Sequence, residues 1–83
     1  MSRKIARIEH TIEVEEIAYR LQRLKREKGM TQDEIADAVG VVRQTAGKWL
    51  VGISAPDAIA LISLSKLFDV STDYILGLKE REK

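Results

Sequence analysis

Arg43, Gln44, Thr45 and Lys48 stand within six consecutive residues of a short stretch with a helical pattern. An arginine can donate two hydrogen bonds to O6 and N7 of a guanine, and a glutamine can bond N6 and N7 of an adenine. Each such pair discriminates between bases by about 1–3 kcal/mol. Lys48 is a point charge, which suits a phosphate or a guanine without bidentate geometry. The stretch therefore has the chemistry to read DNA in the major groove, and the simpler alternative is a solvated helix face.

Other kinds of site lack the residues they need. The chain has no cysteine and a single histidine, His10, so neither a cysteine-based zinc site nor a histidine triad can be built. There is no nucleophile–base pair and no phosphate-cradling glycine loop. Asp33, Glu34 and Asp37 read as helix-start and surface acids. We predict that the protein is not an enzyme and has no catalytic residue, metal site or cofactor.

Length and charge set further bounds. The 83 residues make one domain, or one domain with a tail. No apolar run approaches the roughly 20 residues of a membrane span, and no apolar segment predicts a secretory signal. The net charge is only +1, but residues 1–30 hold eight Lys/Arg against five Asp/Glu. Residues 20–28 hold five of these cations and one acid, which predicts either a solvated helix face or a phosphate-facing edge.

Five segments have a helical pattern. Residues 14–28 carry an apolar stripe and end at Gly29. Residues 31–39 begin with Thr31 and Glu34 at capping-box spacing and end at Gly40. Residues 43–50 place their apolar side chains on one side and the polar ones, with Gly47, mainly on the other. A fourth helix is predicted from about residue 57 to 68, and a last short one over 73–76 with Thr72 as its cap.

The beginning of the chain allows two interpretations. Ile5, Ile8 and Ile12 have helical spacing, which favours an extra helical turn or two. A flexible basic arm is the alternative. We divide the chain into an N-terminal segment (1–13), a helical domain (14–78) and a charged tail (79–83).

The order and spacing of these pieces resemble the phage repressor and Cro-type (Xre-like) helix-turn-helix family. The matching stretches are LKREKGMTQDEIADAVGV, RQT, KW followed by Gly52, and LSKLFDVSTDYILG, which lie within residues 14–78. The resemblance implies an all-α, compact five-helix domain whose third helix enters the major groove of double-stranded DNA. It also implies that Gln32 contacts a phosphate. The residues that should face base edges or flanking phosphates are Arg43, Gln44, Thr45, Gly47 and Lys48.

Four residues depart from the pattern of that family, which usually has a capping Ser or Thr at Val42, a larger aliphatic at Ala46, a polar residue at Gly47 and Glu at Leu50. Val42 cannot cap, which costs about 1 kcal/mol. Gly47 either lets the helix approach the groove closely or marks a weakened binding face. Val42, Leu50 and Val51 add apolar character, which suits thymine methyl groups or a protein partner.

The resemblance implies a sequence-specific DNA-binding transcriptional regulator, a cytoplasmic repressor encoded by a bacterium or a phage. It would bind a palindromic operator as a homodimer, with dimer contacts around Tyr74 to Leu78 or from the N-terminal segment. We expect no membrane association and no small-molecule substrate. The alternative is a protein-interaction module, antitoxin-like or anti-repressor-like, with weakened DNA binding.

Overall fold

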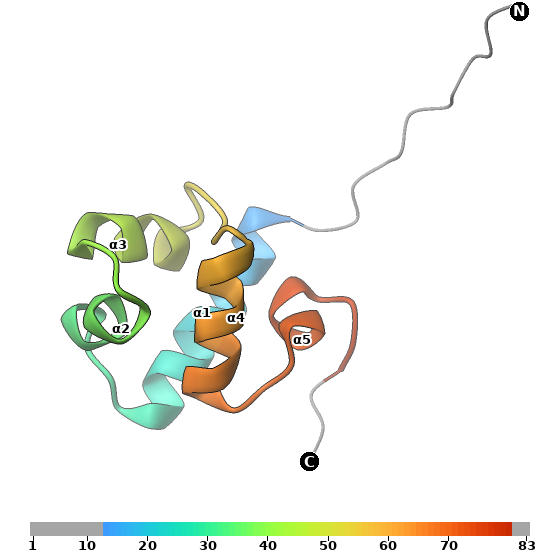
Figure 1. Ribbon diagram of the computed structural model, residues 1–83. Helices are drawn as coiled ribbons and strands as arrows, with labels where there is room; N and C mark the ends of the chain where they lie inside the picture. Colours follow the sequence, from blue (N-terminus) through green and yellow to red (C-terminus); the bar gives the residue numbers. More distant parts are fainter. Residues whose placement is uncertain (1–12, 81–83) are drawn as a thin grey trace, which may run out of the picture.

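Five α-helices follow one another between residues 13 and 80, the part of the chain that the computed structural model describes (Figure 1). They are α1 (Val14–Lys28), α2 (Gln32–Val39), α3 (Arg43–Val51), α4 (Ala58–Phe68) and α5 (Thr72–Leu76). These described residues form no β-strand, and the predicted all-α fold is confirmed. The expected N-terminal helical turn or basic arm over residues 1–12, and residues 81–83 of the tail, lie outside the described residues.

The first two helices begin and end where local sequence signals predict. α1 ends at Gly29, whose N–H donates to the carbonyl oxygen of Arg26 at 3.2 Å. At the start of α2, the Glu34 N–H donates to Thr31 Oγ1 at 3.1 Å, and the Thr31 N–H donates to Glu34 Oε1 at 2.8 Å. This reciprocal pair is the predicted capping box, which satisfies two backbone donors that a helix start otherwise leaves without partners.

The cap of the last helix is one residue away from its predicted position. Ser71, and not Thr72, accepts the N–H of Tyr74 at 3.0 Å, so that Thr72 is the first residue of α5. Both hydroxyl residues can cap a helix, so local preference did not separate them. The choice is made by packing, because Tyr74 and Ile75 must both be buried.

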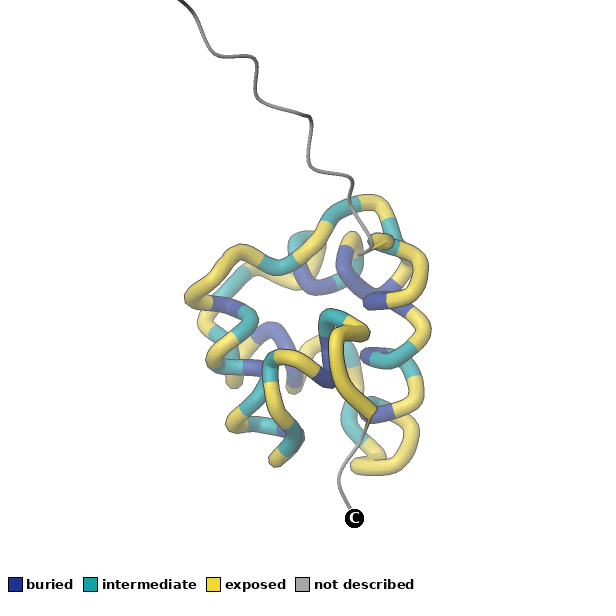
Figure 2. Tube along the Cα trace, turned by 90° about the vertical axis from the view of Figure 1, so that its right-hand side faces the viewer, coloured by how far each residue is buried: buried dark blue, intermediate teal, exposed yellow. Residues whose placement is uncertain are grey.

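The core is built from aliphatic residues of all five helices with Trp49, Phe68 and Tyr74 among them. Figure 2 shows buried positions recurring along the helices, with exposed positions between them. Within this core, Trp49 is 4% exposed and Ile35 1%. Ile59 and Ile62 of α4, by contrast, remain exposed.

α3 packs against both α1 and α2. The Gln22 side chain of α1 donates from Nε2 to the carbonyl oxygen of Leu50 at 2.9 Å. Leu50 itself is only 6% exposed, so the expectation that it adds to an outward apolar surface is wrong. The reason is that Leu50 lies one helical turn beyond the buried Ala46 and therefore shares its inward face, as the helical pattern of residues 43–50 predicts.

Candidate nucleic-acid interface

A short turn joins α2 to α3 and sets their relative placement. Gly40 ends α2 with φ +86°, in the left-handed region that residues with a Cβ rarely adopt. The N–H groups of Gly40 and Val41 both donate to the carbonyl oxygen of Ala36, at 2.8 and 3.0 Å. Val41 then packs against the core. The turn therefore brings the start of α3 back beside the start of α2.

The start of α3 has no side-chain cap. Val42 holds the N-cap position in an extended conformation, and its side chain accepts no hydrogen bond, as its chemistry predicts. The N–H of Thr45 donates instead to the Val42 carbonyl oxygen at 3.0 Å. The Val42 side chain is 65% exposed. It therefore presents an apolar surface directly beside Arg43.

Gln32 holds this uncapped start from the neighbouring helix. Its Nε2 donates to the carbonyl oxygen of Arg43 at 3.0 Å. A Cβ added to Gly47 would lie 2.7 Å from the same Nε2 atom, closer than such atoms approach one another. The position of Gly47 thus faces α2, and the missing side chain leaves room for the Gln32 amide. This is a structural reason for the glycine that neither of the two interpretations from sequence contained.

A second contact joins the same two helix starts. Asp33 Oδ1 lies 2.8 Å from Arg43 Nε, with the two side chains 69% and 66% exposed. From its place in the sequence, Asp33 was expected to be only a helix-start and surface acid. The available signal was its place beside Gln32 in a helix-turn-helix unit, opposite in charge to the first residue of the next helix. Arg43 is therefore held twice, by its backbone and by its side chain.

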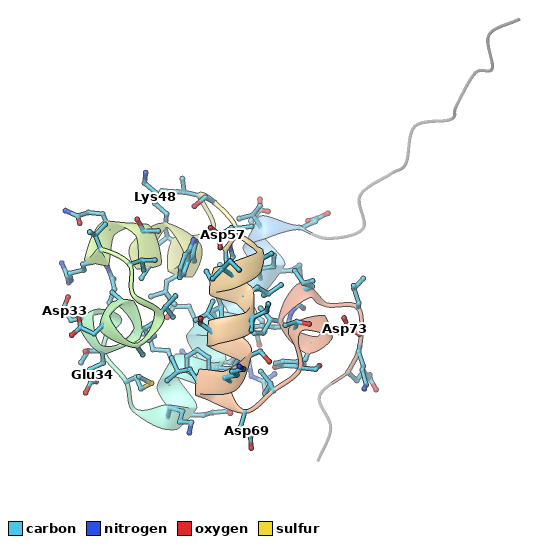
Figure 3. The ribbon with its side chains drawn as sticks, viewed as in Figure 1. Asp33, Glu34, Lys48, Asp57, Asp69 and Asp73 are labelled. Carbon is cyan, nitrogen blue, oxygen red and sulfur yellow. The ribbon has the colours of Figure 1, made fainter. Side chains whose placement is uncertain are left out.

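The remaining predicted residues lie along α3. Gln44 and Lys48 are exposed, and Thr45 is half-buried. Figure 3 shows Lys48 projecting from α3 into solvent, and Asp33 pointing outward from α2. Arg43, Gln44 and Lys48 are thus accessible to a ligand, while Gln32 and Gly47 meet each other between the two helices. The contacts expected with bases and phosphates stay predictions.

The cation-rich stretch of α1 is partly occupied in internal contacts. Arg20 Nε donates to the carbonyl oxygen of Ile75 in α5 at 3.0 Å, and its side chain is 16% exposed. Arg23 lies 3.8 Å from Glu27, one helical turn further on. Arg20 therefore serves to join α1 to α5. For Arg20 and Arg23, which lie in the first part of residues 20–28, these contacts favour the interpretation of a helix face over that of a phosphate-facing edge.

Residues 13–80 contain no group of three or more His, Cys, Asp or Glu side chains placed to hold a metal ion. Within the same residues, none of the helices has both the length and the apolar character needed to cross a membrane.

The chain is similar to known helix-turn-helix proteins. The pattern that defines the family described as helix-turn-helix matches residues 21–75. The SPbeta prophage-derived uncharacterized HTH-type transcriptional regulator YonR of Bacillus subtilis is 40% identical over 57 residues, which are 69% of this chain and 53% of YonR. The chain thus spans about half the length of the curated relatives that it matches.

Two solved structures have a similar fold. A transcriptional regulator from Listeria innocua is 31% identical with a TM-score of 0.71, over 81% of this chain and 63% of that one. The P22 c2 repressor, solved in complex with a synthetic operator, is 24% identical with a TM-score of 0.72, over 76% of this chain and 96% of that one. At that identity the second likeness shows the fold alone. None of these three relatives is named as an enzyme.

Proposed function

This chain belongs to the helix-turn-helix family, and on that premise we propose that it is a sequence-specific DNA-binding transcriptional regulator. We propose further that it is a repressor, that α3 lies in the major groove and that the protein acts in the cytoplasm. The names of its relatives support the role in transcriptional regulation, since YonR and the Listeria innocua protein are called transcriptional regulators. So does the chemistry of α3, which suits base edges better than any small substrate.

The observation that carries the proposal is the exposure of Arg43, Gln44 and Lys48 on a helix whose start is held by its neighbour. Base readout needs donors that are accessible and also fixed in place, since ordering them on binding costs conformational entropy. The Gln32 bond to the Arg43 carbonyl oxygen supplies part of that order. Backbone N–H groups at the start of α2 also suit a phosphate, so that few cations are required.

The test is selection of bound duplexes from a randomised DNA pool, followed by titration at several salt concentrations. We expect enrichment of a two-fold symmetric motif, with half-sites about 34 Å apart, and an affinity that falls steeply with salt. Weak binding without enrichment would contradict the proposal. It would favour the alternative of a protein-interaction module, for which the exposed Val42 and Val51 at the two ends of α3 are the supporting observation.

Two variants separate base contacts from phosphate contacts. Arg43→Ala should reduce discrimination at one base position by about 5- to 150-fold. Gln32→Ala should weaken binding to all sequences by about tenfold, and it should also lower discrimination at the base that Arg43 contacts, because the bond to the Arg43 backbone is lost. Lys66→Ala, which removes an exposed cation from α4, is the matched control and should change neither quantity. If Arg43→Ala and Gln32→Ala bind the operator as tightly as the control Lys66→Ala does, the proposed docking of α3 in the major groove is contradicted.

We propose a homodimer whose contacts include Leu78. Tyr74 and Ile75 are buried in the core, so Leu78 is the exposed large apolar residue of the expected segment, Tyr74 to Leu78. Leu78→Glu should therefore shift a dimer to monomer in analytical ultracentrifugation. Ile62→Glu, on the exposed side of α4, is the comparison variant. If only the Ile62 variant dissociates, the contacts belong to α4 and not to the end of the chain.

A further inference from the structure

The ion pair between Asp33 and Arg43 has no part in the roles that the helix-turn-helix resemblance assigns. Asp33 is the second residue of α2 and Arg43 is the first residue of α3, with Oδ1 and Nε 2.8 Å apart. Both side chains are mostly exposed, and an exposed ion pair contributes little to folding. What the pair affects is the placement of the guanidinium group, and not the stability of the fold.

The geometry of the pair leaves one edge of the guanidinium open. The carboxylate approaches Arg43 most closely at Nε, and the guanidinium group pairs with no other side chain among residues 13–80. Two neighbouring N–H donors are what the O6 and N7 acceptors of a guanine require. A free arginine side chain samples many rotamers, so a contact that restricts them reduces the entropy lost on binding.

We propose that Asp33 is a positioning residue for base readout: it holds Arg43 at Nε so that the terminal nitrogen pair is presented to a guanine. The Arg43 backbone is held at the same time by Gln32, the residue before Asp33. Two consecutive residues of α2 thus fix the backbone and the side chain of one residue of α3. The inference rests on the proposed function, since it requires that α3 reads DNA.

The charge of Asp33 makes the proposal easy to separate from a general electrostatic effect. A carboxylate close to DNA is repelled by phosphates, so its removal should tighten binding to any sequence. Loss of positioning should instead weaken the recognition of one guanine. The two effects have opposite signs, and they are distinguished by comparing cognate with altered DNA.

The experiment uses Asp33→Asn and the matched control Asp37→Asn. Asp37 lies on the same helix, is exposed, and takes part in no ion pair within residues 13–80. Dissociation constants are measured for the selected duplex, for the same duplex with 7-deazaguanine at the guanine whose readout Arg43→Ala abolishes, and for random-sequence DNA. Circular dichroism melts of both variants fix a temperature at which all proteins are folded.

We expect Asp33→Asn to reduce the discrimination between guanine and 7-deazaguanine by about threefold to fivefold. Asp37→Asn should leave that ratio unchanged, while both variants bind random-sequence DNA equally or slightly more tightly. An unchanged ratio in Asp33→Asn would overturn the inference and leave the proposed function standing. So would tighter cognate binding at an unchanged ratio, because Asp33 would then only compete with DNA. If the wild-type protein selects no motif containing such a guanine, the inference fails, and if it selects none at all the proposed function fails with it.

Discussion

The starts of α2 and α3 are held in different ways although they lie side by side. α2 is capped from within, by two reciprocal hydrogen bonds between Thr31 and Glu34, three residues apart. α3 has no cap of its own and is held by Gln32 and Asp33 of α2, residues ten or more positions earlier. A helix that caps itself needs only its local sequence, whereas α3 depends on the correct placement of another helix.

This difference has a functional meaning if α3 reads DNA. The contacts from α2 are made to Arg43, the first residue of the helix and the one best suited to a guanine, and they leave the N–H groups of the helix start without a side-chain cap. A Ser or Thr at position 42 would satisfy backbone donors but would not touch the Arg43 side chain. Holding α3 from α2 therefore combines support of the helix with placement of its arginine.

The largest expected effect comes from removing the core contact of α3. The Trp49 side chain is buried in the core, so Trp49→Ala should lower the free energy of unfolding by about 3–5 kcal/mol, the usual cost of truncating a buried tryptophan. Urea denaturation followed by circular dichroism measures it. Val51→Ala, an exposed position on the same helix, should change stability by less than about 0.5 kcal/mol. A loss for Trp49→Ala as small as that of the control would mean that α3 is held mainly by α2.

The second largest change in unfolding free energy is expected when the N-cap residues of α2 and α3 are replaced in turn. Thr31→Ala removes the capping box and should cost about 1 kcal/mol of unfolding free energy. Val42→Ala removes a side chain that makes no cap bond, so we expect a change below about 0.5 kcal/mol. Equal losses in the two variants, measured by the same urea titration, would contradict the contrast between the two helix starts.

A third variant would give α3 the cap that it lacks. Val42→Thr keeps nearly the same shape and adds a hydroxyl oxygen at an exposed N-cap with an extended backbone. We expect a gain of about 0.5–1 kcal/mol in unfolding free energy, seen as a higher melting temperature. If the melting temperature does not rise, water already satisfies the N–H groups at the start of α3 as well as a hydroxyl cap would.

Gly47→Ala is expected to give the smallest change in unfolding free energy and a larger change in DNA affinity. Alanine favours the helix by up to about 1 kcal/mol, and displacement of the Gln32 amide from the Arg43 carbonyl oxygen offsets a similar amount. Unfolding free energy should therefore move by less than about 0.5 kcal/mol.

DNA affinity is the more informative readout for this substitution. It should fall in Gly47→Ala, because Gln32 loses its place between the helices. The double variant Gln32→Ala/Gly47→Ala should then bind DNA as Gln32→Ala does. Additive losses would show that Gly47 acts by a route other than Gln32.

Much of the fold followed from local patterns. The apolar spacing of α1, the capping box of α2 and the glycines after both helices use residues within a turn of one another, so sequence alone placed these elements correctly. The same local rules did not separate Ser71 from Thr72 as the cap of α5, because both can cap. The helical pattern of residues 43–50 placed Leu50 on the buried apolar side, as observed, and only the comparison with the family pattern suggested an outward apolar role for it.

The candidate site was predictable in part. Side-chain types and the family resemblance pointed to Gln32 and to the polar residues of α3, and the structure places Arg43, Gln44 and Lys48 on an accessible surface. The ion pair of Arg43 with Asp33 was missed, and so was the fit of Gln32 against Gly47. Each joins residues of two different helices, and no spacing rule within one helix reports such a pair.

The sequence by itself determined which segments become helices and which residue types are available to meet DNA, because hydrophobic periodicity and capping act over a few residues. Only the tertiary structure decided how α3 is held and what Gly47 is for. The turn at Gly40 brings two helix starts together, and distances between side chains on separate helices are set by that turn and by the shared core. Contacts of this kind depend on the packing of the whole domain.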